Sequence, residues 1–288
     1  MRLLIIGNND GPLRLSRSLA GSAHRVVGVG LQKYTAALAA ELAPHCAQIV
    51  ATPTETEATR FADSLSFDLL VNCFANFKYK TLHHRYPAVN VHPTPLPRYR
   101  GRHPLRWALI NGETRFGITV HRLADGFDDG AILWQHSLDV IPGWSAIELR
   151  KALLDLLEKN WATLLDDYVA GRLKILPNRD AEATHVTRRS PADSILTDWH
   201  DHRRVWRKVR ALREDAHPAR LHTPEGQWPI PDARLGERRF VGFQVGRVVG
   251  RTVDEREIVC ADGHTVWLRG AFGRALPINA SVILPTTL

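Results

Sequence analysis

The sequence has 288 residues, 44% of them hydrophobic, and 38 Lys and Arg against 30 Asp and Glu give it a formal charge of +8. This length fits one large or two modest domains with a buried core. The three scattered cysteines favour neither a disulfide framework nor a cysteine zinc site, and no early apolar run reaches the length of a signal-peptide core or a membrane span, so we expect a cytoplasmic protein without membrane association.

Strand-like and helical segments alternate at the start of the chain. Aliphatic runs predict strands at residues 2–7, 25–30, 47–51 and 68–73, and helical spacing predicts helices at 13–20, 34–42 and 55–65. Such alternation is typical of a Rossmann-like α/β fold, with a mostly parallel sheet covered by helices on both faces. The turns contain neither a G-x-G-x-x-G dinucleotide motif nor a P-loop.

The next segments place polar residues at the end of a strand. Residues 88–92 predict a strand that carries Ala88, Asn90 and His92 on one face, and a proline-rich stop follows at 93–97. Further elements are expected at 103–111 (helix), 117–123 and 131–141 (strands) and 145–169 (helix), with a tight loop at 124–130.

Beyond this helix the periodicity fades. Residues 178–198 are polar without a sustained period, which predicts a linker between a first domain, 1–177, and a small β-rich domain, 199–288. A short helix at 205–212 precedes several short strands with turn signals, and these are typical of a β-barrel-like module.

Asn90 and His92 are candidates for chemistry because side chains at the carboxyl end of a strand point into the crevice of such a sheet. A bare N-x-H pattern equally fits residues that satisfy the backbone of the following loop. Asp128, in the acid- and glycine-rich loop, would orient His92 if the fold brought the two together, although an ordinary Asx-turn explains the same loop.

Four ordered blocks resemble the formyltransferases that use 10-formyltetrahydrofolate, a family that includes enzymes acting on methionyl-tRNA, glycinamide ribonucleotide and nucleotide-linked amino sugars. The blocks are Val89-Asn-Val-His-Pro-Thr-Pro-Leu-Pro-Arg-Tyr-Arg-Gly101, Trp107-Ala-Leu-Ile-Asn-Gly-Glu113, Gly117-Ile-Thr-Val-His121 and Gly126-Phe-Asp-Asp-Gly-Ala-Ile-Leu133. They match the pattern N-x-H-P-[SA]-x-L-P-x-[YWH]-[RK]-G and a later acid that partners the histidine. The resemblance is fainter after residue 177.

The resemblance makes residues 1–177 the catalytic domain and places Asn90, His92 and Asp128 at its three catalytic positions. Asn90 and His92 would stabilise the oxyanion of the formyl group, and Asp128 would hold His92 and accept the proton of the attacking amine. Asp129 stands where the family has Thr or Gly, which leaves open which acid faces the histidine. No metal is implied, and the histidine spacing suggests none.

The resemblance also implies a crevice for 10-formyltetrahydrofolate beside the loop of residues 124–130. Asp125, Gly126 and Phe127 of this loop are the expected backbone contacts. The rings expected to flank the pterin, with packing in the core as the alternative reading, are Phe74, Phe77 and Tyr79.

The acceptor is the least constrained part of this reading. A cluster of cations at 203–213 fits tRNA phosphates, or else the solvated side of an amphipathic helix whose apolar face consists of Val205, Trp206, Val209 and Leu212. The basic insertion of the tRNA enzymes after the second strand is missing, which favours a small amine, most simply a nucleotide-linked amino sugar. The expected phosphate contacts are Arg98, Arg100, Arg102 and Arg106. Two further alternatives are that the protein hydrolyses 10-formyltetrahydrofolate or that it is an inactive binding homologue. The sequence does not determine the oligomeric state.

Overall fold

The structure, a computed structural model, describes residues 1–272 and 275–284. It contains two compact units. The α/β unit consists of Met1–Gly101, Arg115–Leu138 and Arg150–Val186, and the second unit of Arg102–Thr114, Asp139–Leu149 and the described residues from Thr187 onward. The first nine residues of the predicted linker, 178–186, therefore group with the α/β unit, and two segments of the predicted first domain group with the second.

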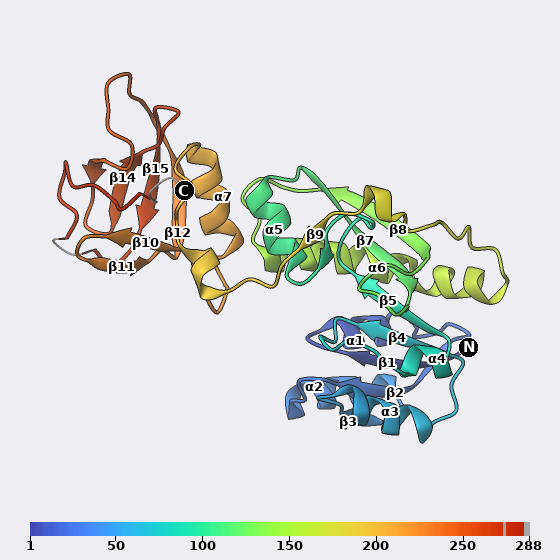
Figure 1. Ribbon diagram of the computed structural model, residues 1–288. Coiled ribbons are helices and arrows are strands. Elements are labelled where there is room, and N and C mark those ends of the chain that lie inside the picture. The colour runs from blue at the N-terminus through green and yellow to red at the C-terminus, as the bar shows by residue number, and fades with distance from the viewer. Residues whose placement is uncertain (273–274, 285–288) are drawn as a thin grey trace. The chain divides into compact units, whose positions relative to one another are not determined.

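The α/β unit is built on a seven-stranded sheet with the strand order β3-β2-β1-β4-β5-β7-β8 (Figure 1). The strands β1 to β5 pair in parallel, and β7 runs antiparallel to β5. The strands are β1 (Arg2–Gly7), β2 (Arg25–Leu31), β3 (Ile49–Ala51), β4 (Leu69–Cys73), β5 (Ala88–His92), β7 (Arg115–Arg122) and β8 (Ile132–Asp139). This confirms the predicted Rossmann-like, mostly parallel sheet.

Helices cover both faces of this sheet. The helices are α1 (Gly11–Arg17), α2 (Ala36–Leu42), α3 (Glu55–Asp63), α4 (Leu82–Arg85) and α6 (Ala146–Val169), with 3-10 turns η1 (Ala43–His45) and η2 (Asp180–Glu182). Phe61 of α3 and Leu82 of α4 pack in one core cluster with Leu70 of β4. Trp161 of α6 lies beside Val89 of β5, on the opposite face.

Local sequence explains where these elements begin and end. Thr54 and Glu57 form a capping box at the start of α3: the Glu57 backbone N–H donates to Thr54 Oγ1, and the Thr54 N–H donates to Glu57 Oε2 at 3.0 Å. The buried strand β5 ends at His92, where the proline-rich segment begins. The side chains of Asn90 and His92 are thereby fixed at a strand end.

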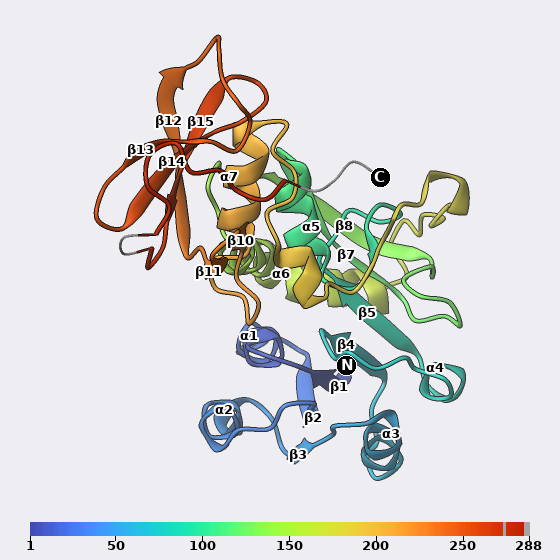
Figure 2. The same cartoon turned by 60° about the vertical axis from the view of Figure 1, so that its left-hand side comes forward.

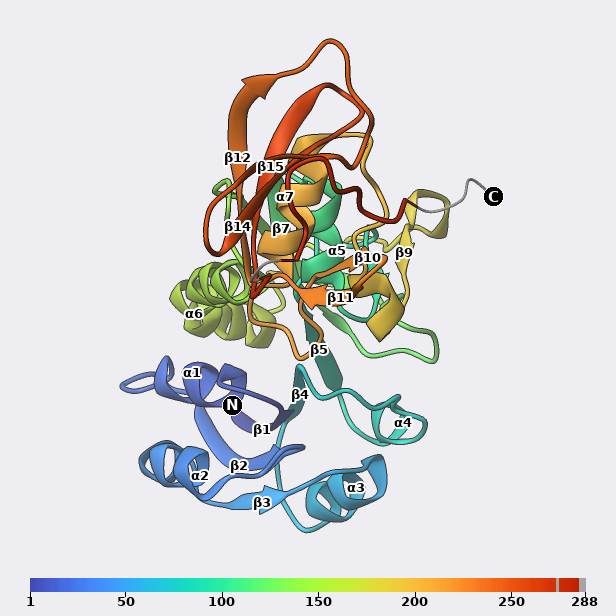
Figure 3. The same ribbon diagram turned by 90° about the vertical axis from the view of Figure 1, so that its left-hand side faces the viewer.

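The second unit joins two helices to antiparallel strands. Its elements are α5 (Pro104–Asn111), η3 (Pro191–Ser194), α7 (His202–Ala211), β10 (Arg220–Thr223), β11 (Gly226–Pro229), β12 (Asp232–Arg239), β13 (Val248–Arg251), β14 (Glu255–Val259) and β15 (His264–Arg269). Four strands form a sheet in the order β12-β15-β14-β13, and β10 and β11 form a hairpin. Helix α7 packs against β12 and β15 (Figures 2 and 3). In the part of the chain that the structure describes, every helix is too short or too polar to cross a bilayer.

Candidate active site

Three polar side chains form a row across neighbouring strands of the α/β unit. The strand register pairs Asn72 of β4 with Asn90 of β5, and Asn90 with His121 of β7. All three residues are buried, as is His92 two positions along β5. Buried polar groups are costly unless they find partners. The hydrogen bonds of these side chains therefore determine how each of them is oriented.

A directional chain of hydrogen bonds fixes the carboxamide of Asn90. Tyr79 Oη donates to Asn72 Oδ1 at 3.0 Å, and Asn72 Nδ2 donates to Asn90 Oδ1 at 2.7 Å. Asn90 Nδ2 lies 2.9 Å from Nε2 of His121, whose Nδ1 lies 2.9 Å from the carbonyl oxygen of Arg122. Burial lowers the pKa of His121 to about 4, so the ring is neutral at pH 7, with Nδ1–H donating and Nε2 accepting. The amide hydrogens of Asn90 therefore point away from Asn72.

Asp128 brings a carboxylate to the same place. Its Oδ1 accepts from Asn90 Nδ2 at 3.3 Å and lies 3.4 Å from Nδ1 of His92, while its Oδ2 accepts from the Gly101 backbone N–H at 2.9 Å. The residue has a φ of 55°, in the left-handed region that Asp tolerates better than most residues. The backbone thus turns this carboxylate, buried to 14% exposure, toward His92.

The neighbouring Asp129 takes no part in this convergence. Its Oδ1 is buried and makes no hydrogen bond within the described chain, and its Oδ2 lies against Gly126. The question left open by the sequence is thereby answered: Asp128 is the acid that faces His92. On the other side of the ring, Nε2 of His92 lies 3.2 Å from the carbonyl oxygen of Tyr99, so both ring nitrogens face acceptors.

The loop that carries Asp128 is held by a residue that the sequence analysis assigned to a linker. Asn178 Nδ2 donates to the backbone carbonyls of Asp128, at 2.8 Å, and Gly130, at 3.1 Å. Arg100 in turn donates to the side-chain and backbone oxygens of Asn178. The only sequence signal for Asn178 is an amide in a polar stretch, which by itself indicates no role.

Glycine is required where this loop closes. A Cβ on Gly130 would lie 1.9 Å from the carbonyl oxygen of Arg122, and one on Gly101, whose φ is 110°, would lie 2.3 Å from the carbonyl oxygen of Val186. The second contact reflects the pairing of β6 (Arg100–Gly101) with β9 (His185–Val186). Chain segments far apart in sequence therefore support both the Asp128 loop and the Gly101 N–H that binds its carboxylate.

The three aromatic residues expected beside a pterin have different surroundings. Tyr79 is buried, and its hydroxyl is engaged by Asn72. Phe77 is half-buried, packs edge-on against Tyr79 with ring centroids 5.0 Å apart and borders the core. Phe74 is half-buried, and its ring lies close to Gly11. Tyr79 has the core position that was the alternative reading.

In the Asp128 loop, Asp125, Gly126 and Phe127 are exposed. The Phe127 ring is 58% exposed, with the Lys78 ammonium 5.0 Å from its centroid. Asp125 contacts two histidines described below. More than half of the Phe127 side chain therefore remains accessible to a ligand.

The four arginines expected to bind phosphate do not form one group. Arg100 is buried and forms an ion pair with Asp180, and Arg106 forms one with Asp215. Arg98 and Arg102 are exposed. The structure gives Arg100 a different task, since its hydrogen bonds hold Asn178.

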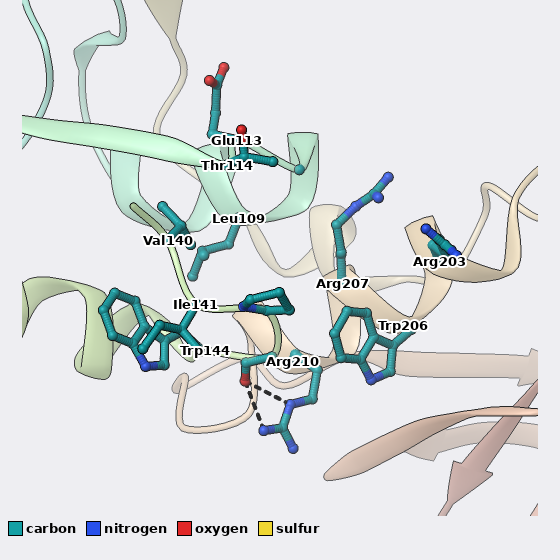
Figure 4. Close-up of a pocket in the computed structure, with 13 residues that line it drawn as sticks. Leu109, Glu113, Thr114, Val140, Ile141, Trp144, Arg203, Trp206, Arg207 and Arg210 are labelled. Carbon is teal, nitrogen blue, oxygen red and sulfur yellow. Dashed lines mark hydrogen bonds between the residues drawn. The ribbon is translucent and has the colours of Figure 1, made fainter. Parts of the chain in front are cut away.

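The cluster of cations at 203–213 forms one side of α7. Val205, Val209 and Leu212 are buried, and arginines on the other side pair with acids of the same unit: Arg204 with Asp198, Arg207 with Asp201 and Arg210 with Asp232. Arg213, just after the end of the helix, pairs with Glu148. Figure 4 shows Arg203, Arg207 and Arg210 around a cavity of about 220 Å³ that Trp144 and Trp206 also line. Arg210 donates to the carbonyl oxygen of Gly143 there, as the dashed lines mark. This is the amphipathic helix that was the alternative to a tRNA surface.

Comparison with known proteins agrees with the site. Residues 56–164, which include Asn90, His92, His121 and Asp128, match the family model described as formyl transferase. The match covers 109 of the 288 residues and shows that this part of the chain is similar to formyl transferases.

Three solved structures illustrate what the chain is similar to in fold. An N-formyltransferase from Helicobacter canadensis, in complex with folinic acid and dTDP-3-aminofucose, is 16% identical with a TM-score of 0.74 over 93% of this chain and 98% of that one. HypX from Aquifex aeolicus in complex with tetrahydrofolic acid is 21% identical with a TM-score of 0.66, over 93% and 43%. Methionyl-tRNA formyltransferase from Clostridium thermocellum is 16% identical with a TM-score of 0.60, over 83% and 94%. These likenesses establish the fold, and the chain spans less than half of the length of HypX.

Proposed function

We propose that this chain is an N-formyltransferase that moves a formyl group from 10-formyltetrahydrofolate to a primary amine. The observation that carries the proposal is the convergence of Asn90, His92 and Asp128 at the end of β5, inside the part of the chain that matches the formyl transferase family. A carboxamide donor, an imidazole and a carboxylate around one point are the groups that attack of an amine on a formyl carbon requires.

Asn90 and His92 are the candidate donors to the formyl oxygen. Their Nδ2 and Nδ1 atoms lie 3.3 and 3.4 Å from Asp128 Oδ1, longer than the about 2.7–2.9 Å of a short charge-assisted hydrogen bond. Asn72 and His121 fix the Asn90 carboxamide. Its remaining amide hydrogen and the Nδ1–H of His92 can therefore be shared with a second oxygen nearby, whose negative charge grows as the amine attacks. One well-placed donor of this kind contributes about 3 kcal/mol to transition-state stabilisation.

Asp128 holds the imidazole and is the candidate acceptor for the proton that the attacking amine loses. The carbon–nitrogen bond to the folate then breaks, and this proton is returned to the folate nitrogen, which leaves as the amine of tetrahydrofolate. The Oδ2 of Asp128 is anchored on the Gly101 N–H, so Oδ1 is the atom available for this role, directly or through a water molecule. When bound, 10-formyltetrahydrofolate supplies the activated formyl group. The exposed residues 125–127 of the loop, the Phe127 ring among them, are the candidate contacts for the folate.

The proposed acceptor is a nucleotide-linked amino sugar. Support comes from the Helicobacter canadensis enzyme, whose complex holds dTDP-3-aminofucose and whose length this chain covers almost fully, and from the pairing of the α7 arginines with acids. Phosphate contacts of Arg98 and Arg102 stay predictions.

An acceptor panel tests the proposal. Purified protein is incubated with 10-formyltetrahydrofolate and dTDP-, UDP- or GDP-linked amino sugars, aminoacylated initiator tRNA, or no acceptor, and tetrahydrofolate and formylated product are quantified. We expect product with an amino sugar. Formation of formylated methionyl-tRNA would show that tRNA, and not an amino sugar, is the acceptor. Release of formate without any acceptor would show that the chain hydrolyses the folate.

His92→Ala provides the internal control for this assay. Because the variant loses one oxyanion donor, turnover should fall by at least about 100-fold, with an unchanged circular dichroism spectrum. Near-native turnover would remove His92 from the mechanism.

A further inference from the structure

Two adjacent histidines and one acid form a cluster away from Asn90 and His92. His83 and His84 lie on α4, and their Nε2 atoms are each 2.9 Å from Oδ1 of Asp125, in the loop of residues 124–130. The two rings lie 4.0 Å apart between centroids, and the three ligand atoms all lie within 4.8 Å of one another. This cluster belongs to the α/β unit alone.

The chemistry of the cluster is that of a three-ligand zinc site. Zn²⁺ binds histidine nitrogen at about 2.0–2.1 Å and carboxylate oxygen at about 2.0–2.2 Å, with tetrahedral geometry and, in open sites, a fourth position for water. Ligand atoms arranged in this way lie roughly 3.3 Å apart, close to the observed nitrogen–oxygen separations of 2.9 Å. We propose that His83, His84 and Asp125 bind a divalent transition-metal ion such as Zn²⁺.

The burial of the three side chains suits this role. The His83 side chain is 4% exposed, so its ring is fixed by packing, whereas those of His84 and Asp125 are 57% and 80% exposed and open to an incoming ion. Within the described part of the chain, the Asp125 carboxylate makes its side-chain contacts with these two histidines. The site thus combines one rigid ligand with two accessible ones.

A second cluster in the chain, formed by Asp201, His202 and Asp262, is a weaker candidate. It offers one imidazole instead of two. Its carboxylates are already engaged by the backbone, because Asp201 accepts from the Arg203 N–H at the start of α7 and Asp262 accepts from the His264 N–H. These hydrogen bonds would compete with a metal. The preference for the first cluster therefore rests on ligand type and availability.

A metal here would tie α4 to the loop that carries Asp128, three residues after Asp125. In the absence of the metal that tie consists of two hydrogen bonds to one exposed carboxylate, which contribute little in water. Metal binding to the folded chain stabilises it by mass action. The expected role is to restrain the loop, and binding itself does not depend on the proposed formyl transfer.

The test measures binding of Zn²⁺ to the full-length, tag-free protein after dialysis against a chelator. Competition with a chromophoric indicator should give one Zn²⁺ per chain, and Co²⁺ should produce the visible absorption of a tetrahedral site. His84→Ala and Asp125→Asn, both at exposed positions, should each weaken binding by at least about tenfold. His136→Ala, at an exposed histidine of β8, is the matched control and should bind like the native chain.

Two results would overturn the site. One is that His84→Ala and Asp125→Asn both bind Zn²⁺ with native affinity. If His202→Ala then abolishes binding, the ion belongs to the second cluster. The other is the absence of stoichiometric binding in the native protein. Circular dichroism of each variant confirms that a loss of binding comes from the lost ligand.

Discussion

Two groups of polar side chains in this molecule are arranged differently in space. On α7, arginines pair with separate acids and surround a buried apolar stripe. At the end of β5, Asn90 and His92 converge instead on one oxygen of Asp128, all largely buried. Arginines that each pair with one acid are typical of a hydrated helix surface, whereas several polar groups that meet at one buried point are typical of a functional site.

The largest expected effect separates the two adjacent acids of the loop. Asp128→Asn removes the carboxylate that faces His92, so kcat/KM for formyl transfer should fall by at least about 100-fold. Asp129→Asn, whose Oδ1 makes no hydrogen bond in the described chain, should change it by less than about threefold. Equal losses in both variants would contradict the assignment of Asp128.

Asn178→Ala tests whether the convergence depends on support from outside the matched family region. The variant loses two hydrogen bonds to the Asp128 loop and leaves Arg100 without its amide partner. We expect kcat/KM to fall about tenfold and the free energy of unfolding to fall by about 2 kcal/mol, measured by steady-state kinetics and denaturant titration. Arg179→Ala, at an exposed neighbouring position, is the control. Native-like activity and stability in Asn178→Ala would show that the Asp128 loop does not need these hydrogen bonds.

The neutral His121 gives the site a pH dependence of stability. Its folded pKa of about 4 lies below the ordinary value of 6.5, so between these values the unfolded chain binds the proton and the folded chain does not. Stability is therefore complete above pH 6.5 and declines as the pH falls toward 4, by about 2 kcal/mol at pH 5. In His121→Gln the loss of unfolding free energy between pH 7 and pH 5 should be smaller by that amount. An unchanged loss would mean that His121 is charged in the fold.

The smallest effect is expected on α7. Arg203→Ala removes a cation at the rim of the cavity in the second unit, and we expect kcat/KM for a small amine to change by less than about threefold and stability by less than about 0.5 kcal/mol. A large loss confined to a tRNA acceptor, relieved at low salt, would instead give the α7 arginines a role in phosphate binding.

Local sequence patterns predicted the strands in which apolar residues are continuous or alternate regularly. Residues 2–7 and 88–92 were bounded as β1 and β5 are, because continuous or alternating apolar residues end at strong turn signals. β12 was missed since Asp232–Arg239 is rich in charges and has little apolar alternation. Its pairing with β15 is a long-range feature that no local window contains.

The site was predictable only in part for the same reason. Strand alternation placed Asn90 and His92 on one face, and the family resemblance added Asp128. The choice between Asp128 and Asp129 required the left-handed backbone at Asp128, and Asn72 and His121 required the strand register. Asn178 lies 50 residues from the carbonyl that it binds, so only the folded chain reveals it.

The position of Asn178 has a practical consequence for dissecting the protein. An excised α/β fragment that stops where the periodicity of α6 fades would leave out the amide that binds the Asp128 and Gly130 carbonyls, and also the β9 segment that pairs beside Gly101. A fragment meant to retain the geometry around His92 should therefore extend at least through Val186 and include the two excursions of the chain, Arg102–Thr114 and Asp139–Leu149, that interrupt this unit. Cutting at a boundary read from the sequence would remove the support of the loop that carries Asp128 while leaving Asn90, His92 and Asp128 in the fragment.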